Sequence, residues 1–352
     1  MEFKSLFVNY REEIKKRIYE ILDEKEEDYK SRVNTQIDAF EVLRNFSTKG
    51  KMLRGSLFLF SAQAYGCKIN ENLLNIASSL ELMHSALLIH DDIMDNDSLR
   101  RGEKTIFSKY KDSAKESGIR NYDHYGISMG IVIGDIALFI AEEIAVYSDE
   151  KRLHEMLKFY TQELRYVGLG QLLDFSYGAQ DTEFSADDIK RMYIDKSARY
   201  SFTLPLCLGA ISAAAASSEI KLVEQLGERM GLIFQLIDDD LGMFGNEDEI
   251  GKPVGSDVRE NKKTFIRSLL MQKTDVALKN ELNLIFGNQN IGIAEIETVR
   301  RLILDLGVRD EIKEVISGLY DEAYEKINDL NIGNDYKRIF IDLLDYNTKR
   351  TF

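Results

Sequence analysis

Hydrophobic residues recur at helical spacing along most of this chain. Leu6, Tyr10, Ile14, Ile18 and Ile21 lie three or four residues apart, which predicts an amphipathic helix over residues 3–22. The same amphipathic spacing runs from residue 264 to the end of the sequence. The pattern therefore predicts a chain built mainly of helices.

One helical run changes character where it ends, in the segment ELMHSALLIHDDIMDNDSLRRG at 81–102. We expect Asn70 to cap this helix. Residues three and four apart share a helix face, and here they form the stripe His84, Leu87, Leu88, Asp91 and Asp95, with Asp92 beside it. Carboxylates one turn apart repel each other unless a cation lies between them, and Mg²⁺ prefers oxygen ligands. The stripe thus predicts a metal site above an apolar wall.

A second predicted helix, from Lys221 to about Leu241, also ends in acids, GLIFQLIDDDLGMFG. The polar loop that follows, 246–263, is long enough to act as a lid. Two facing aspartate clusters with bridging Mg²⁺ can hold a diphosphate and stabilise it as a leaving group. Basic residues that could complete the neutralisation are Lys51, Arg54, Arg100, Arg101, Lys196, Lys252 and Lys262.

Each feature also has a simpler interpretation. An isolated DDxxD is as consistent with a solvated helix end as with a metal site. Here the acids follow an apolar stripe, two arginines follow the acids, and a second acid cluster recurs, so the joint pattern favours the metal site. His84 alone would be a hydrogen-bonded core histidine, but on the stripe below Asp91 it becomes a candidate phosphate donor.

Composition agrees with long helices and argues against nucleic acid as a partner. The 352 residues include two prolines, no tryptophan and 44% hydrophobic residues, and proline is the strongest helix breaker. The formal charge of -14 argues against a broad nucleic-acid surface, which needs a basic face. It does not exclude a small phosphorylated ligand.

Cys67 and Cys207 are too few and too far apart for a disulfide framework or a zinc site, which indicates a reducing compartment. The first residues have charges every few positions and no apolar signal segment. The most apolar stretch, 126–141, contains Asp135 and falls short of a membrane-spanning helix. We expect a cytoplasmic protein without a transmembrane segment.

At this point the residues resemble a known family, the trans-isoprenyl diphosphate synthases or polyprenyl synthetases, over nearly the full length. The matching segments, in the family's order, are GKMLRG at 50–55, HDDIMDNDSLRRG at 90–102, GQLLD at 170–174, DKS at 195–197, FQLIDDDLG at 234–242, GKPVGSD at 251–257 and NKKT at 261–264. The form DDxLGxFG resembles archaeal members, including geranylgeranyl and polyprenyl diphosphate synthases.

The resemblance implies an all-α, single-domain fold over 1–352, an isoprenoid-synthase-type helical bundle around a central apolar cavity, and a homodimer. It implies head-to-tail condensation of isopentenyl diphosphate with dimethylallyl, geranyl or farnesyl diphosphate. The product would be an all-trans prenyl diphosphate. The implied cofactor is Mg²⁺, three ions per active site, with Mn²⁺ as an alternative.

Residue roles follow from the resemblance position by position. Asp91, Asp95 and Asp238 would bind Mg²⁺, supported by Asp92 and Asp239, and Lys196 completes the expected catalytic set. Isopentenyl diphosphate would be held by Lys51, Arg54, His84 and Arg101. The allylic diphosphate would be held by Arg100, Lys196, Ser197, Gln235, Lys252 and Lys262.

Two features set this chain apart from the family pattern. Gly55 replaces the proline that ends the first motif, and Gly242 stands where many members have the last aspartate of the second. On a continuing helix Gly242 shares a face with Asp238, whereas Asp240 points away. Product length in the family is limited by side-chain bulk below the first aspartates. Met83, Ala86 and Leu87 lie there without an aromatic floor, which favours geranylgeranyl diphosphate or a somewhat longer product.

Two other functions compete with the prenyltransferase. A catalytically silent subunit of a heteromeric synthase would have the same fold, although a silent partner need not keep the complete acidic and basic set. A class I terpene cyclase has a similar helical fold, but IDDDLG lacks the asparagine, serine and glutamate of the cyclases' second metal motif.

Overall fold

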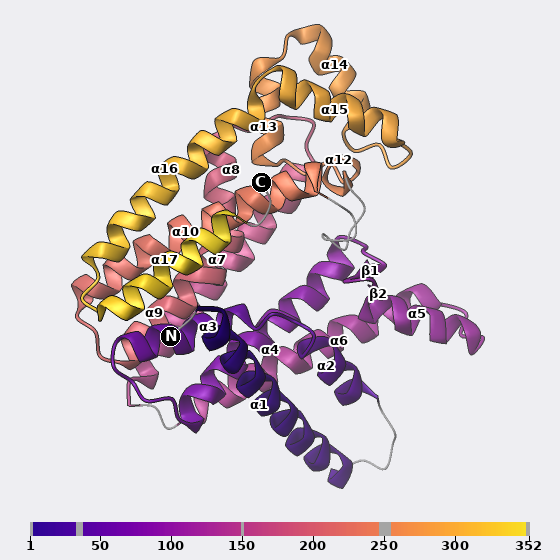
Figure 1. Ribbon diagram of the computed structural model, residues 1–352. Helices are drawn as coiled ribbons and strands as arrows, with labels where there is room; N and C mark the ends of the chain where they lie inside the picture. Colours follow the sequence, from indigo (N-terminus) through magenta and orange to yellow (C-terminus); the bar gives the residue numbers. More distant parts are fainter. Residues whose placement is uncertain (1–2, 33–37, 149–150, 246–254, 350–352) are drawn as a thin grey trace. The chain divides into compact units, whose positions relative to one another are not determined.

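The computed structural model describes residues 3–32, 38–148, 151–245 and 255–349. These residues are almost entirely helical, and the all-α fold class is confirmed (Figure 1). The chain divides into two compact units: unit 1 is Met1–Leu157 with Leu208–Ala215, and unit 2 is Lys158–Cys207 with Ala216–Phe352. No helix in the described part of the chain has the length and apolar character needed to cross a membrane.

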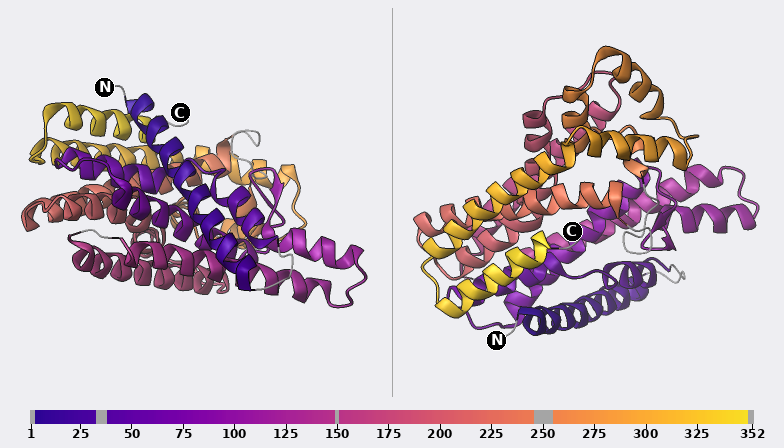
Figure 2. Two further views of the ribbon diagram at one scale, coloured as in Figure 1. Left: turned by 90° about the horizontal axis from the view of Figure 1, so that it is seen from below. Right: turned by 45° about the horizontal axis from the view of Figure 1, so that its top comes forward.

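Unit 1 contains the helices of the first motif. Its elements are α1 (Phe3–Arg32), α2 (Ala39–Ser47), α3 (Leu53–Ala64), α4 (Glu71–Met94), β1 (Leu99–Arg100), β2 (Glu103–Lys104), α5 (Ile106–Glu116) and α6 (Tyr122–Val146). The two short strands form an antiparallel hairpin that pairs Leu99 with Lys104 and Arg100 with Glu103. Helix α1 packs against α2, α3 and α4 (Figure 2). It extends ten residues beyond the predicted 3–22.

Helix α3 is the most deeply buried element of unit 1. Leu57, Phe58, Leu59 and Phe60 are consecutive and each 0% exposed, so α3 is covered on every side. A helix that is apolar all round is stable only inside a core. Because α3 is buried on every side, its N-terminal turn, which carries the predicted basic residue Arg54, is held in place.

Unit 2 contains the second motif. Its elements are most of α7 (Leu153–Gly178), α8 (Ala186–Tyr193), the π-helix η1 (Ile194–Thr203), the start of α9 (Leu204–Ser212), α10 (Ser217–Phe244), α12 (Ser256–Arg259), α13 (Phe265–Lys273), α14 (Val276–Ile285), α15 (Ile293–Asp305), α16 (Val308–Asp329) and α17 (Asn334–Thr348). Helix α10 packs against η1. It also packs against α16 and α17 (Figure 1). The ring centroids of Phe202 on η1 and Phe234 on α10 are 5.5 Å apart.

Two details of unit 2 bear on the predicted site residues. Ser185 caps α8, its hydroxyl accepting the Asp188 N–H at 3.2 Å, and because α8 ends at Tyr193, Lys196 lies on the following helix, η1. The proposed lid at 246–263 is described only from residue 255, where the short helix α12 replaces part of the expected loop. Residues 246–254, which include Lys252, lie outside the described residues, and the lid stays a prediction.

Gly55, which replaces the family's proline, lies where α1, α3 and α4 meet. A Cβ at this position would come within 2.8 Å of the Ala77 carbonyl oxygen and 2.8 Å of Ile14 Cδ1. The Gly55 N–H donates to Glu81 Oε1 at 2.8 Å, a bond that a proline cannot make. Close packing and this hydrogen bond together account for the glycine.

We expect Gly55→Ala to lower the free energy of unfolding by about 1–3 kcal/mol, because the added methyl group must displace backbone atoms. The matched control is Gly318→Ala in α16, where nothing lies within 4 Å of the added Cβ. The control should gain about 0.5–1 kcal/mol from helix propensity. Chemical denaturation measures both, and equal stability of the two variants would contradict the packing argument.

Candidate functional site

The acidic end of α4 has the predicted stripe. Asn70 caps the helix by accepting the Leu73 N–H at 2.9 Å, and the helix ends at Met94, followed by the C-cap residue Asp95, whose N–H donates to the Asp91 carbonyl at 2.8 Å. Asp91 and Asp95 are half-buried, whereas Asp92 is 1% exposed. The two carboxylates predicted to bind metal thus lie on the more open face, with Asp92 behind them.

Asp92 is held by Arg100 from the β-hairpin. Arg100 Nε donates to Asp92 Oδ1, and Arg100 Nη2 lies 3.5 Å from Asp91 Oδ2. Burial raises the pKa of Asp92 to about 6, although the Arg100 charge opposes the rise. Asp92 Oδ2 is buried and has no hydrogen-bond partner among the described residues. This arrangement fits a supporting role for Asp92.

Basic side chains gather beside this acidic helix end in unit 1. The charges of Arg54, Arg100 and Arg101 all act on His84, and burial together with these charges lowers the His84 pKa well below its usual range. His84 is therefore a neutral imidazole that can still donate a hydrogen bond. Gly50, next to Lys51, lies beside the Arg101 guanidinium, since a Cβ there would be 3.6 Å from Arg101 Nη2.

Crowded cations repel one another, and a bound anion relieves that repulsion. Burial lowers the pKa of Arg101, and the nearby Arg100 charge adds to the effect. The structure thus brings Arg54, His84, Arg100 and Arg101 together in unit 1, and Gly50, the neighbour of Lys51, lies beside Arg101. The positive charge of this group suits an anion with several charges.

Glu81 is a site residue that sequence reasoning missed. Its carboxylate is 4% exposed and accepts hydrogen bonds from the backbone of Arg54 and Gly55 at the N-terminus of α3. Burial raises the pKa of Glu81, and the nearby Arg54 charge opposes that rise. Glu81 therefore fixes the turn that carries Arg54. The only signal in the sequence was an acid inside an apolar run.

The three aspartates at the acidic end of α10 also differ in how deeply they are buried. Asp239 is 5% exposed, accepts a hydrogen bond from the Tyr193 hydroxyl, and accepts another from Gln235 Nε2 at 3.1 Å. Burial, and then the nearby Asp257 charge, raise the pKa of Asp239 to about 8. Asp238 is half-buried and is the most open of the three.

Asp240 points away from Asp238, as its helical position predicts. Arg309 on α16 binds it through two hydrogen bonds of 2.8 Å. Asp257, the last residue of the 251–257 motif, lies on α12, and a Cβ at Gly242 would lie 3.3 Å from Asp257 Oδ2. A carboxylate from α12 thus lies beside the helix position where many members of the resembling family have their last aspartate.

Two further predicted cations of unit 2 lie within the described residues: Lys196 is on η1, and Lys262 lies between α12 and α13. Lys196 on η1 pairs with Asp174 on α7, and Lys262 pairs with Glu260 at 3.1 Å. Ser197 is half-buried next to Lys196. An ammonium group has three donors, so Lys196 can bind a phosphate while it remains paired with Asp174.

Residues 40–303 match the model of the polyprenyl synthetase family. The chain belongs to this family. It is 33% identical over 228 residues, 64% of each chain, to a short chain isoprenyl diphosphate synthase of Methanocaldococcus jannaschii. It is 25% identical over 300 residues to a geranylgeranyl diphosphate synthase of Sulfolobus acidocaldarius, across 82% of this chain and 83% of that one.

A solved structure extends the similarity to nearly the whole chain. The crystal structure of a geranylgeranyl pyrophosphate synthase from Corynebacterium glutamicum, in complex with isoprenyl diphosphate and magnesium, has a TM-score of 0.91. It is 27% identical and covers 97% of this chain and 99% of that one. The family resemblance seen in the sequence is confirmed.

Polyprenyl synthetases use metal ions, and the carboxylates found here fit Mg²⁺. Asp91, Asp95 and Asp238 offer hard oxygen donors. No group of three or more His, Cys, Asp or Glu side chains within the described ranges is arranged to hold a metal by itself. Mg²⁺ usually keeps several waters and binds through one or two carboxylates plus substrate phosphates. The donor set therefore fits a metal that binds together with a diphosphate.

We expect Glu81→Gln to loosen the N-terminal turn of α3, because the substitution removes the charge that accepts its backbone N–H groups. Amide hydrogen exchange at Arg54 and Gly55 should become about three- to tenfold faster. Glu71→Gln, at the exposed start of the same helix α4, is the control and should leave these amides unchanged. Unchanged exchange in Glu81→Gln would show that the carboxylate does not hold the turn.

Proposed function

We propose that this chain is a trans-prenyltransferase. It condenses isopentenyl diphosphate head-to-tail with an allylic diphosphate, namely dimethylallyl, geranyl or farnesyl diphosphate. The product is an all-trans prenyl diphosphate, with geranylgeranyl diphosphate or a somewhat longer chain as the best fit. One observation, made separately in each unit, carries the proposal. At each acidic helix end one aspartate is half-buried and its neighbour is buried and hydrogen-bonded: Asp92 accepts from Arg100, and Asp239 accepts from the Tyr193 hydroxyl.

The basic group of unit 1 is proposed to hold isopentenyl diphosphate. Lys51, Arg54 and Arg101 supply positive charge, and neutral His84 supplies a donor. Two or more cations at a diphosphate give charge-assisted hydrogen bonds, which are about twice as strong as neutral ones. Glu81 keeps the Arg54 turn in place.

The allylic diphosphate is proposed to bind at the acidic helix ends with Arg100, Lys196, Ser197, Gln235, Lys252 and Lys262. Arg100 and Gln235 each already touch an aspartate, Asp92 and Asp239 respectively. They therefore position those carboxylates as well as contacting substrate. Lys196 is oriented by Asp174.

The reaction proceeds by loss of the allylic diphosphate. The C–O bond to the diphosphate breaks, the leaving group takes the electron pair, and an allylic carbocation remains. Bound Mg²⁺ supplies Lewis-acid neutralisation of the departing charge. Lys196 and Arg100 stabilise the same charge through hydrogen bonds. The double bond of isopentenyl diphosphate attacks the cation, forming the new C–C bond, and a proton is lost, with the released diphosphate as the proposed acceptor.

Three further properties belong to the proposal. The metal count is three Mg²⁺ ions per active site, with Mn²⁺ able to substitute. The enzyme acts in the cytoplasm. Residues 1–352 form a single polyprenyl synthetase domain, which is supported by the family match over residues 40–303.

The direct experiment incubates the purified chain with farnesyl diphosphate, isopentenyl diphosphate and Mg²⁺. We expect diphosphate release and a longer prenyl product, both abolished by EDTA and restored by Mg²⁺. Asp91→Asn and Asp238→Asn should each lower kcat/KM at least about 100-fold, because each removes charge where the leaving group is stabilised. Asp310→Asn, an exposed acid on α16, is the control and should retain full activity.

Two outcomes would favour the alternatives. Absence of diphosphate release from the chain alone would favour a catalytically silent subunit that needs a partner synthase. A cyclic hydrocarbon formed without isopentenyl diphosphate would favour a class I terpene cyclase. Product analysis by chromatography distinguishes all three.

Product length is proposed to depend on Met83, Ala86 and Leu87. Leu87 is half-buried on the face of Asp91, whereas Met83 and Ala86 are each 1% exposed. We expect Ala86→Phe to shorten the product and to cost about 1–3 kcal/mol of stability from overpacking. Leu87→Phe places the same ring on the open stripe and should shorten the product at a lower stability cost. Unchanged product lengths in both variants would contradict the proposal that side-chain bulk at these positions limits product length.

A homodimer is proposed from an apolar face on α6. Ile127, Ile131, Phe139 and Val146 are exposed at helical spacing, and Phe139 is 62% exposed. A stripe of this kind on one helix is typical of a surface that a second copy covers. Light scattering should give twice the 40.4 kDa chain mass, and Phe139→Glu should give the monomer mass. A monomeric wild-type chain would contradict this assignment.

A further inference from the structure

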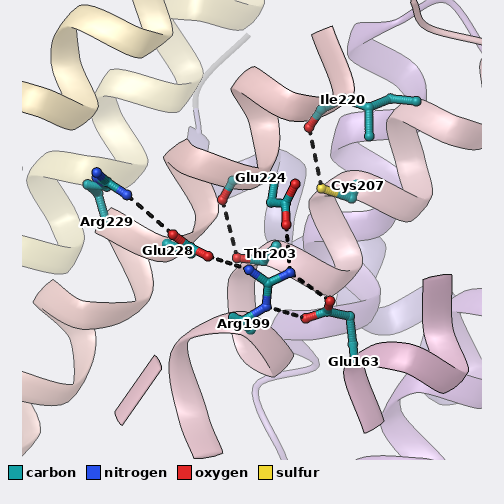
Figure 3. Close-up of polar contacts among 8 residues, drawn as sticks. All are labelled: Glu163, Arg199, Thr203, Cys207, Ile220, Glu224, Glu228 and Arg229. Atoms are coloured by element: carbon teal, nitrogen blue, oxygen red, sulfur yellow. Dashed lines mark hydrogen bonds and ion pairs between the residues drawn. The ribbon is translucent and has the colours of Figure 1, made fainter. Parts of the chain in front are cut away.

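A single arginine in unit 2 is surrounded by carboxylates that the proposed chemistry does not use. Arg199 donates through Nε and Nη2 to Glu163 at 2.8 and 2.7 Å, through Nη2 to Glu224 at 2.7 Å, and through Nη1 to Glu228 (Figure 3). Arg199 is 9% exposed and Glu163 is 0% exposed. Glu228 also accepts from the nearby Arg229 at 3.3 Å.

The charge of Arg199 is permanent in this setting. Burial opposes it, but the hydrogen bonds to Glu163 and Glu224 outweigh burial and raise the Arg199 pKa. Burial raises the pKa of Glu163, against the pull of Arg199. A buried ion pair is strongly unfavourable to break from one side, because the remaining charge loses its partner. The cluster therefore holds its geometry firmly.

The cluster joins three helices. Glu163 lies on α7, Arg199 on η1, and Glu224 with Glu228 on α10, one turn apart (Figure 3). The same three helices carry residues of the proposed allylic-diphosphate site. Asp174 lies three turns beyond Glu163 on α7, and Asp239 lies three turns beyond Glu228 on α10. Lys196 lies three residues before Arg199.

The backbone of η1 has almost no free space on either side. A Cβ at Gly170 of α7 would lie 2.4 Å from the backbone nitrogen of Lys196. A Cβ at Gly231 of α10 would lie 2.4 Å from the Ala198 Cα. The helix therefore lies directly against backbone on both sides. A small shift or rotation of η1 would move the Lys196 side chain relative to Asp174.

The π-helical form of η1 is a further reason why the position of this helix matters. π-Helices are rare and occur mostly as single turns, frequently at functional sites. Here the π-helical segment spans ten residues, Ile194–Thr203, and directly follows α8. Arg199 lies near the middle of η1 and forms ion pairs with carboxylates of both neighbouring helices, α7 and α10.

We propose that Arg199 is a positioning residue for the allylic diphosphate. By holding η1 between Glu163 on one side and Glu224 and Glu228 on the other, it fixes where Lys196 presents its ammonium group. The inference rests on the proposed function, because it assigns Lys196 to the allylic diphosphate. Isopentenyl diphosphate is proposed to bind residues of unit 1, so its affinity does not depend on η1.

The test compares both substrates in Arg199→Met, Arg199→Lys and a control. The KM and the calorimetric Kd for farnesyl diphosphate should rise about tenfold in Arg199→Met. Those for isopentenyl diphosphate should stay within about twofold. Arg199→Lys keeps the charge but loses the forked geometry, so its values should fall in between. The control Arg229→Met removes a neighbouring partner of Glu228 and should leave both substrates unaffected.

Glu163→Gln keeps the protein testable if Arg199→Met does not fold, because Arg199 retains Glu224 and Glu228. Its Kd for farnesyl diphosphate should rise about threefold. Equal losses for both substrates, or no loss for farnesyl diphosphate in either variant, would overturn the positioning role. A wild-type chain that binds both substrates but forms no product would overturn the proposed function, while the Kd comparison would still decide the role of Arg199.

Discussion

Repulsion between carboxylates is the physical constraint on which the acidic helix ends depend. Adjacent aspartates at the end of a buried helix cannot all remain charged and unpaired. The protein resolves this by assigning each buried acid a fixed partner: Arg100 for Asp92, the Tyr193 hydroxyl for Asp239, and Arg309 for Asp240. The more open acids are Asp91 and Asp95 in unit 1 and Asp238 in unit 2, and each is half-buried at the end of its own helix, which suits the proposed binding of a metal ion together with a diphosphate.

This division of labour links burial to chemistry. A carboxylate held by hydrogen bonds keeps one orientation and one set of neighbours, so its charge stays in a fixed position during the reaction. A more open carboxylate can exchange water for a metal ion at lower cost. Asp257 on α12 lies beside Gly242 and adds a further carboxylate to this acidic helix end.

Charges buried away from the acidic ends serve packing and position. Glu81 holds the N-terminal turn of α3, and Arg199 holds η1 against α7 and α10. In both cases a backbone contact too close for any side chain, at Gly55 or at Gly231, accompanies the polar anchor. Close backbone approach fixes the distance between helices, and the buried charge fixes the register.

The sequence by itself determined the helices, their acidic ends and the family, because helical periodicity, the Asn70 cap and the order of short motifs are local properties of the chain. It also separated Asp240 from Asp238, since helix geometry alone sets that angle. Only the tertiary structure identified Glu81, Tyr193, Arg199 and Asp257 as supports, and only it placed Lys196 on a π-helix. Their partners lie tens of residues away, and a hydrogen bond between distant residues leaves no periodic trace in a single sequence.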